Sequence, residues 1–103
     1  MAAQQTGIPI DVLEMAARVL RVLAHPHRLK MVELLEQGRK TVGQLAGMLD
    51  LAPSAVSQHL NQMRAHGILE VERQGREAYY HVVNPNARNV LECIRQHGCG
   101  RSS

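Results

Sequence analysis

Aromatic residues are almost absent from this chain of 103 residues, which has no tryptophan, no phenylalanine and only two tyrosines, Tyr79 and Tyr80. Its hydrophobic residues, 45% of the total, are therefore mostly aliphatic. An aliphatic core suits packed helices better than a β-sandwich, because strands favour aromatic side chains. The composition predicts a mainly α fold, and the length predicts a single domain.

Cysteine and long apolar runs are also scarce. The two cysteines, Cys93 and Cys99, are too few for a disulfide framework, which argues against a small secreted scaffold. Residues 1–6 have no basic segment followed by an apolar one, and no apolar run is long enough to span a membrane. We expect a cytoplasmic protein with reduced thiols and no membrane partner.

Hydrophobic periodicity, proline starts and glycine stops divide the chain into four helices, a small β-hairpin and a last helix. Thr41 and Gln44 have the spacing of a capping box, and Pro53 suits the first turn of a helix that Gly67 ends. The predicted helices span 10–24, 26–37, 42–49, 53–66 and 86–97, the predicted strands span 68–73 and 76–83, and the tails are 1–9 and 98–103. This order is that of a winged helix-turn-helix.

The first predicted helix has an apolar stripe too wide for one neighbour to cover. A chain this short also buries a thin core unless a second copy completes it. We therefore expect a homodimer in which this helix packs partly on a partner chain. The residues of the stripe are Val12, Met15, Ala16, Val19, Leu20, Val22 and Leu23.

The helix that begins near Pro53 has two different faces at 100° per residue. One face is apolar and should point into the core, with Val56, Leu60 and Met63. The opposite face is short, polar and uncharged, which lets a helix approach base edges closely, and glutamine and asparagine can pair with an adenine edge. Its residues are Ser54, Ser57, Gln58, Asn61 and Ala65.

The charge distribution favours an anionic partner for the same helix. The formal net charge is +3, and no acidic residue lies between Asp50 and Glu70, a span that contains Arg64. A helix lying among phosphates needs such an acid-free surface. These observations predict that the helix reads the major groove of double-stranded DNA.

The predicted hairpin has an arginine on each side of its tip, Gln74-Gly75. Arg73 and Arg76 would project from the end of the ribbon toward a phosphate backbone or a minor groove. Three acids share the hairpin, so charge pairing across the strands is the alternative interpretation. These acids are Glu70, Glu72 and Glu77.

Three stretches of the chain read LAHPHRLKMVELL, SAVSQHLNQMRAHGIL and ERQGREAYYHV. Together they resemble the ArsR/SmtB family of winged-helix repressors, and the resemblance covers about Leu20 to Pro85. The resemblance implies a homodimer built from the helices at 10–24 and 86–97, a repressor that an inducer releases from its operator. It also implies that Ser54, Ser57, Gln58 and Asn61 bind the operator.

The sequence does not determine the identity of the inducer. Where the family's metal sensors carry Cys-x-Cys, this chain has Thr41-Val42-Gly43, and Asn84 and Asn86 replace the first ligands of the family's other zinc site. The last helix and tail offer a different set, which a thiophilic metal or metalloid ion could use. This set consists of Cys93, His97 and Cys99. The two cysteines could instead respond to a thiol oxidant, or they could have no function.

The other chemistry-bearing residues favour plainer interpretations. No Ser/His/Asp set, phosphate-binding glycine loop or catalytic carboxylate pair is present, so an enzyme is not expected. The alternatives to a DNA-binding repressor are a winged helix that acts only through protein contacts and a metal or redox protein that binds no DNA. Structural roles are expected for His25, His27, His59 and His81.

Overall fold

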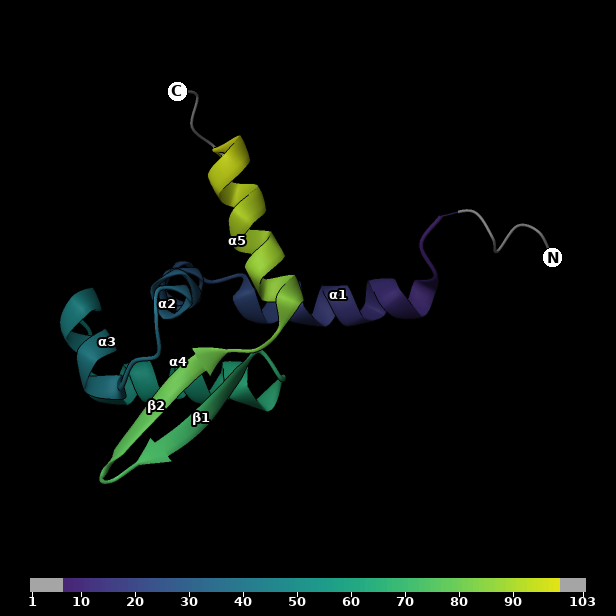
Figure 1. The fold of residues 1–103 in the computed structure, drawn as a ribbon. Coiled ribbons are helices and arrows are strands. Elements are labelled where there is room, and N and C mark those ends of the chain that lie inside the picture. The colour runs from purple at the N-terminus through teal and green to yellow at the C-terminus, as the bar shows by residue number, and fades with distance from the viewer. Residues whose placement is uncertain (1–6, 99–103) are drawn as a thin grey trace.

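The computed structural model describes residues 7–98, and its elements follow the predicted order. Five helices and a two-stranded antiparallel sheet form a winged helix-turn-helix (Figure 1). None of the described helices is long and apolar enough to cross a membrane. The elements are α1 (Ile10–Leu23), α2 (Pro26–Glu36), α3 (Val42–Leu49), α4 (Pro53–Ala65), β1 (Leu69–Gln74), β2 (Glu77–Val82) and α5 (Pro85–His97).

Local sequence signals set the helix-turn-helix. The capping box of α3 is confirmed, because Thr41 Oγ1 accepts from the Gln44 amide at 3.1 Å and Gln44 Oε1 accepts from the Thr41 amide at 2.9 Å. Asp50 ends α3 in the left-handed conformation, with φ 57°. Pro53 then occupies the start of α4. The joint between α3 and α4 is therefore only Asp50 to Ala52, and the two helices run in different directions (Figure 1).

The hairpin turn lies one residue later than predicted. Gln74 is the last residue of β1 and pairs with Glu77, so the two-residue loop is Gly75-Arg76 and not Gln74-Gly75. Gly75 has φ 63°, a value that the first residue of a tight hairpin loop requires and that glycine adopts without strain. Arg76 consequently sits in the turn itself.

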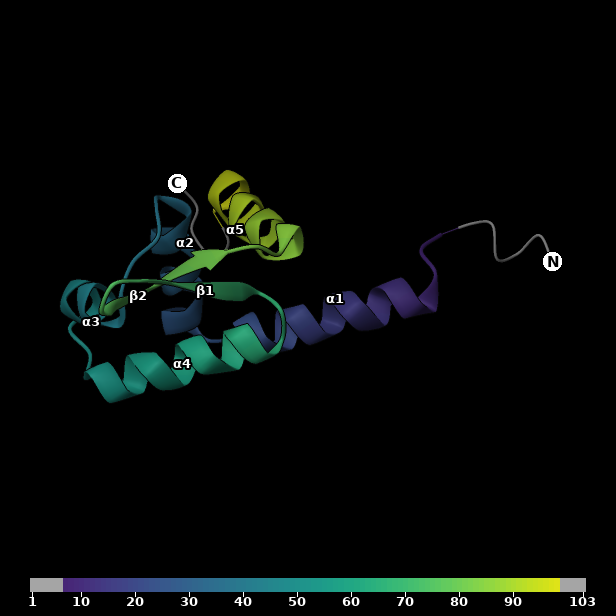
Figure 2. The same ribbon diagram turned by 60° about the horizontal axis from the view of Figure 1, so that its bottom comes forward.

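The core is aliphatic and continuous, and no polar or charged residue among positions 7–98 is buried. Every element contributes to it, through the residues Val19, Val22, Leu23, Met31, Val32, Leu34, Leu35, Leu45, Ala46, Val56, Leu60, Met63, Ile68, Leu69, Tyr80, Val82, Ala87 and Leu91. Only the last part of α1 takes part, since Val19, Val22 and Leu23 are its buried residues. The rest of α1 projects beyond the other elements in both views (Figures 1 and 2).

Candidate nucleic-acid interface

Helix α4 carries its buried and exposed side chains on opposite sides. Val56, Leu60 and Met63 are fully buried and hold the helix against the core. The predicted DNA-facing residues mostly lie at the surface, whereas Ser57 is half-buried at the edge of that face. The exposed ones are Ser54, Gln58, Asn61, Arg64 and Ala65.

The start of α4 is open to an anion. Ala52 precedes the helix and provides no side-chain cap, and the first turn contains no acidic residue. The free amide groups of a helix N-terminus carry a partial positive charge and donate to phosphates. Pro53 has no N–H, and the amides of Ala55 and Val56 donate to the Ala52 carbonyl, so the Ser54 amide is the backbone donor that this start offers to an anion. The helix adds polar side chains along one face.

Two of the three acids of the hairpin face basic side chains. Glu72 accepts from Arg39 at 3.0 Å, and Glu70 Oε1 lies 3.8 Å from His81 Nε2. Among residues 7–98, no ion pair involves Arg73 or Arg76, and both are exposed. Glu77, next to the turn, likewise has no ion pair within that range, so the end of the hairpin carries two unpaired arginines and one unpaired acid.

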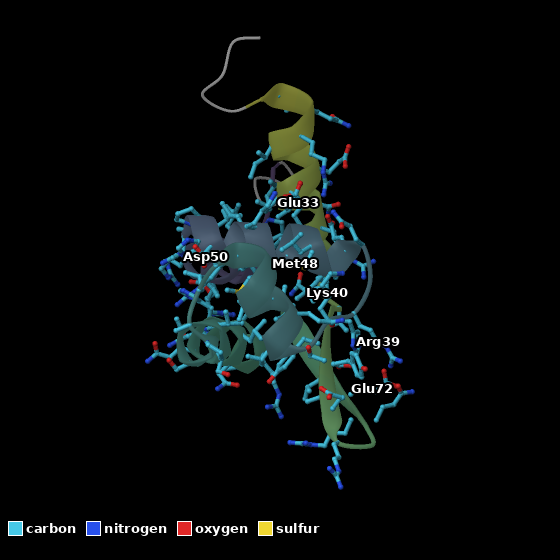
Figure 3. All side chains as sticks on the ribbon, turned by 90° about the vertical axis from the view of Figure 1, so that its left-hand side faces the viewer. Glu33, Arg39, Lys40, Met48, Asp50 and Glu72 are labelled. Atoms are coloured by element: carbon cyan, nitrogen blue, oxygen red, sulfur yellow. The ribbon has the colours of Figure 1, made fainter. Side chains whose placement is uncertain are left out.

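Arg39 joins the hairpin to the loop before α3, a contact that sequence reasoning missed. Its guanidinium donates to Glu72 Oε1 at 3.0 Å and to Gln74 Oε1 at 2.8 Å, and its carbon Cζ lies 4.4 Å from the Tyr79 ring centroid. Figure 3 shows Arg39 beside Glu72 at the edge of the molecule. Arg39 follows Gly38 between two helices, a position that gave no signal of a partner more than thirty residues away.

Lys40 extends the sheet by one backbone bridge. Its amide donates to the Tyr80 carbonyl at 3.2 Å, and the Tyr80 amide donates to the Lys40 carbonyl at 2.8 Å. Together with the contacts of Arg39, this bridge fixes the hairpin to the rest of the domain. The arginines at the tip therefore extend from a supported ribbon.

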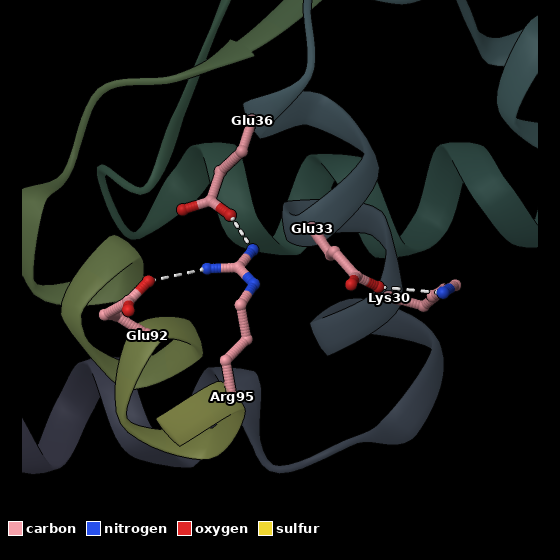
Figure 4. A network of polar contacts seen from close by, with 5 residues as sticks. All are labelled: Lys30, Glu33, Glu36, Glu92 and Arg95. Atoms are coloured by element: carbon pink, nitrogen blue, oxygen red, sulfur yellow. Dashed lines mark hydrogen bonds and ion pairs between the residues drawn. The ribbon is translucent and has the colours of Figure 1, made fainter.

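Polar contacts tie α5 to α2 on another side of the molecule (Figure 4). Arg95 donates to Glu36 on α2 and, at 3.1 Å, to Glu92 one turn earlier on α5. The hydrogen bond to Glu36, followed by the charges of both carboxylates, raises the pKa of Arg95. Ala87 and Leu91 are buried beneath, so α5 is held by apolar packing and by these exposed ion pairs.

A large apolar surface remains uncovered along α1. Of the stripe predicted from the sequence, Val12, Met15 and Leu20 are about half exposed, with 47%, 54% and 51% of their surface accessible. A contiguous exposed apolar surface of this kind marks an interface. The exposed large apolar residues at α1 and α5 are Ile8, Ile10, Val12, Leu13, Met15, Leu20 and Ile94.

The structure places part of the predicted thiol site. Cys93 is a free, exposed cysteine on α5, and His97 is exposed one turn later. Cys99 lies outside the described residues, so the three-residue set stays a prediction. Asn84, at the start of the same helix, accepts from the Asn86 amide at 2.8 Å and serves as an N-cap.

Comparisons with known proteins fit this geometry. A family model described as "Bacterial regulatory protein, arsR family" matches residues 25–71. The chain is 41% identical to the transcriptional repressor PagR of Bacillus anthracis over 80% of its own length and 83% of the relative. It is 32% identical to the biofilm growth-associated repressor of Agrobacterium fabrum, over 84% of its length and 78% of the relative.

Solved structures extend the likeness to three dimensions. The crystal structure of PagR matches 84% of this chain and 99% of PagR, with a TM-score of 0.74 and 39% identity. The solution structure of the homodimeric winged helix-turn-helix DNA-binding domain of Mb0332 from Mycobacterium bovis covers 95% of this chain and 94% of that domain. The TM-score of this match is 0.77 and the sequence identity is 23%, so the match shows a similar fold. This chain belongs to the ArsR family of bacterial regulatory proteins.

Proposed function

We propose that this protein is a transcriptional repressor that binds operator DNA as a homodimer, with α4 in the major groove. The observation that carries the proposal is the division of α4 into a fully buried stripe and an exposed, acid-free polar face. Gln58 and Asn61 are the residues proposed to read base edges. Ser54 and Ser57 are proposed to contact phosphates or bases near the open start of the helix, with Arg64 at its flank.

The hairpin is proposed to act as a wing that contacts the DNA backbone. Arg73 and Arg76 are exposed and unpaired within the described part of the chain, whereas Glu70 and Glu72 face basic partners. Guanidinium groups bind phosphate without reading sequence. The wing therefore contributes affinity, and α4 contributes sequence preference.

The homodimer is proposed to form through α1 and α5. The uncovered apolar residues of α1 need a partner surface, and the first third of the helix has no core contact within its own chain. The relative Mb0332 is described as homodimeric. A two-fold dimer places two α4 helices about one turn of DNA apart, roughly 34 Å, on a pseudo-palindromic site.

The test is selection of duplexes from a random pool, followed by fluorescence anisotropy on the enriched sequence and a scrambled one. We expect an inverted repeat, a clear preference over the scrambled duplex, and affinity that falls steeply as salt rises. An acidic polymer serves as the charge control. Binding to every duplex no stronger than to that polymer would reject the proposal and would favour a winged helix that acts through protein contacts.

Release by an inducer is a separate part of the proposal. We place it at Cys93, His97 and Cys99, where a thiophilic metal, arsenite or a thiol oxidant could react, because Cys93 is exposed beside α1 and the proposed dimer surface. A Cys93→Ser, Cys99→Ser double variant should bind DNA normally and ignore all three reagents. Normal release in this variant would exclude the thiols as sensors while leaving operator binding intact.

A further inference from the structure

Three histidines from two separate segments meet between the start of α2 and the middle of α4. His25 is the N-cap of α2, His27 lies in its first turn and His59 comes from α4. The ring centroid of His25 lies 5.5 Å from that of His27 and 4.5 Å from that of His59, and the His27 and His59 centroids are 6.2 Å apart. All three side chains are half-buried.

The spacing of their nitrogen atoms is close to that of a metal site. One ring nitrogen from each histidine lies within 4.8 Å of the other two. Tetrahedral coordination at the usual zinc–nitrogen length needs nitrogens about 3.3 Å apart, so ring rotations that bring the nitrogens closer by up to about 1.5 Å would complete the set. Among the histidines, cysteines and acids of residues 7–98, these three histidines are the group whose ligand atoms lie close enough together to hold a metal ion.

We propose that His25, His27 and His59 form a binding site for a divalent transition-metal ion of the zinc class. Neutral imidazoles are the preferred ligands of zinc, copper and nickel, and three of them leave a fourth position for water. Because the ligands come from α2 and α4, a bound ion would link the start of α2 to α4. The proposal depends neither on DNA binding nor on the thiols.

Arg28 controls access to this site in the metal-free form. Its Nε donates to His59 Nδ1 at 3.0 Å, and its Nη1 donates to the Val22 carbonyl at 3.0 Å. The His25 Nδ1 similarly accepts from the His27 amide at 3.2 Å. A neutral imidazole has a single nitrogen lone pair to offer. An ion must therefore displace the Arg28 donor from His59 and the His27 amide from His25, so metal binding excludes both hydrogen bonds.

Burial favours the form of His59 that binds metal. Desolvation, followed by the neighbouring His25 and Arg28, lowers the pKa of His59. A metal ligand must be neutral, so this shift is in the direction that favours binding.

Zinc binding is tested by competition with a chromophoric chelator in the full chain carrying Cys93→Ser and Cys99→Ser, which removes the thiols. We expect one zinc ion per chain. His25→Asn keeps a capping acceptor at the start of α2, and it should weaken zinc binding at least about 100-fold, as should His27→Gln and His59→Gln. His66→Gln, at an exposed histidine just after α4, is the matched control and should bind zinc unchanged.

Two further measurements keep the proposal falsifiable if a variant does not fold. In the Cys93→Ser, Cys99→Ser chain that keeps all its histidines, nuclear magnetic resonance should show that zinc shifts the ring nitrogen resonances of His25, His27 and His59. The resonances of His66 and His81 should stay in place. Arg28→Met removes the competing donor and should tighten zinc binding about 10-fold or more. Shifts confined to other histidines, or equal affinity in the three ligand variants and the control, would overturn the site.

Discussion

Helices α1 and α4 have nearly the same length, 14 and 13 residues, and each buries three side chains. They differ in what they leave exposed. The exposed surface of α4 is polar and free of acids, whereas that of α1 is dominated by large aliphatic side chains such as Leu13 and Met15. The partners proposed for the two helices differ accordingly, a polyanion for α4 and a second apolar surface for α1.

One small core thus supports two exposed surfaces of different chemistry. The buried residues of α4 are fully inaccessible, so its outer face is presented at a fixed angle. The first part of α1 has no such anchor, and the proposed dimer would remove its apolar surface from water. The predictions below separate these roles.

The largest effect is expected for Leu60→Ala, at a fully buried position of α4. Loss of the side chain leaves a cavity in the core and should lower the free energy of unfolding by about 2–5 kcal/mol. Urea titrations followed by circular dichroism measure it. Met48→Ala, at a side chain on the outer surface of α3 that is 53% exposed (Figure 3), is the control and should change little. Equal losses in both variants would break the assignment of α4 to the core.

The second effect concerns the exposed face of α1. Leu20→Glu puts an unpaired carboxylate on the proposed dimer surface and should weaken self-association about 100-fold, or about 2.7 kcal/mol. Sedimentation equilibrium measures the change, and circular dichroism should show an unchanged fold. Met48→Glu places the same charge at a similarly exposed methionine away from α1. A dimer that survives Leu20→Glu but not Met48→Glu would move the interface to α3.

On the polar side of the comparison, Gln58→Ala should remove discrimination at one base pair of the selected operator. The expected change is about 1–3 kcal/mol at that pair, with little loss on sequences already altered there. Binding to a panel of single-base operator variants measures it. Gln37→Ala, beyond the end of α2, is the control, and a uniform loss across the panel would assign Gln58 to the backbone instead.

Arg76→Ala should act on affinity without changing sequence preference. Loss of one phosphate contact lowers the slope of log affinity against log salt by about 1 and weakens all duplexes alike. Anisotropy titrations across a salt series measure the slope. Arg21→Ala removes an equal charge from α1, and an equal change in slope there would show that net charge, and not the wing, is responsible.

The smallest effect is expected for the pair of Lys30 and Glu33 on α2, which belongs to neither surface. A hydrogen bond from Lys30 at 2.8 Å lowers the pKa of Glu33 in the folded protein. The pair therefore stabilises the fold at pH values above the unfolded-state pKa of Glu33, and this contribution is lost as the pH falls through its folded-state pKa. The carboxylate is partly exposed, and water limits the contribution to about 0.5 kcal/mol or less. Glu33→Gln should therefore lower the free energy of unfolding slightly at neutral pH and leave it unchanged in acid. Urea titrations at the two pH values measure the difference.

Local signals in the sequence predicted the start of each helix well. The capping box at Thr41 and the proline at position 53 act through neighbouring residues, so no tertiary information was needed. The hairpin turn was placed one residue early because glycine can occupy either loop position, and the register of the strands decides between them.

Contacts between distant residues could not be predicted in the same way. Helical periodicity identified the stripe on α1, but it does not distinguish burial in the chain's own core from burial against a partner. Arg39 and the wing, and the histidines of α2 and α4, meet only after the chain has folded. The expectation of separate structural roles for His25, His27 and His59 therefore did not foresee that they share one cluster.

The attachment of the wing through Arg39 and Lys40 has a consequence for how quickly and tightly DNA can be bound. An isolated two-stranded hairpin is only marginally stable in water, and fixing one residue's backbone costs about 1–2 kcal/mol of conformational entropy. Here the backbone bridge to Tyr80 and the guanidinium contacts order the hairpin as the domain folds. The wing that we propose contacts DNA is thus ordered before binding, and that entropy is lost once, during folding, and not again at each encounter with an operator.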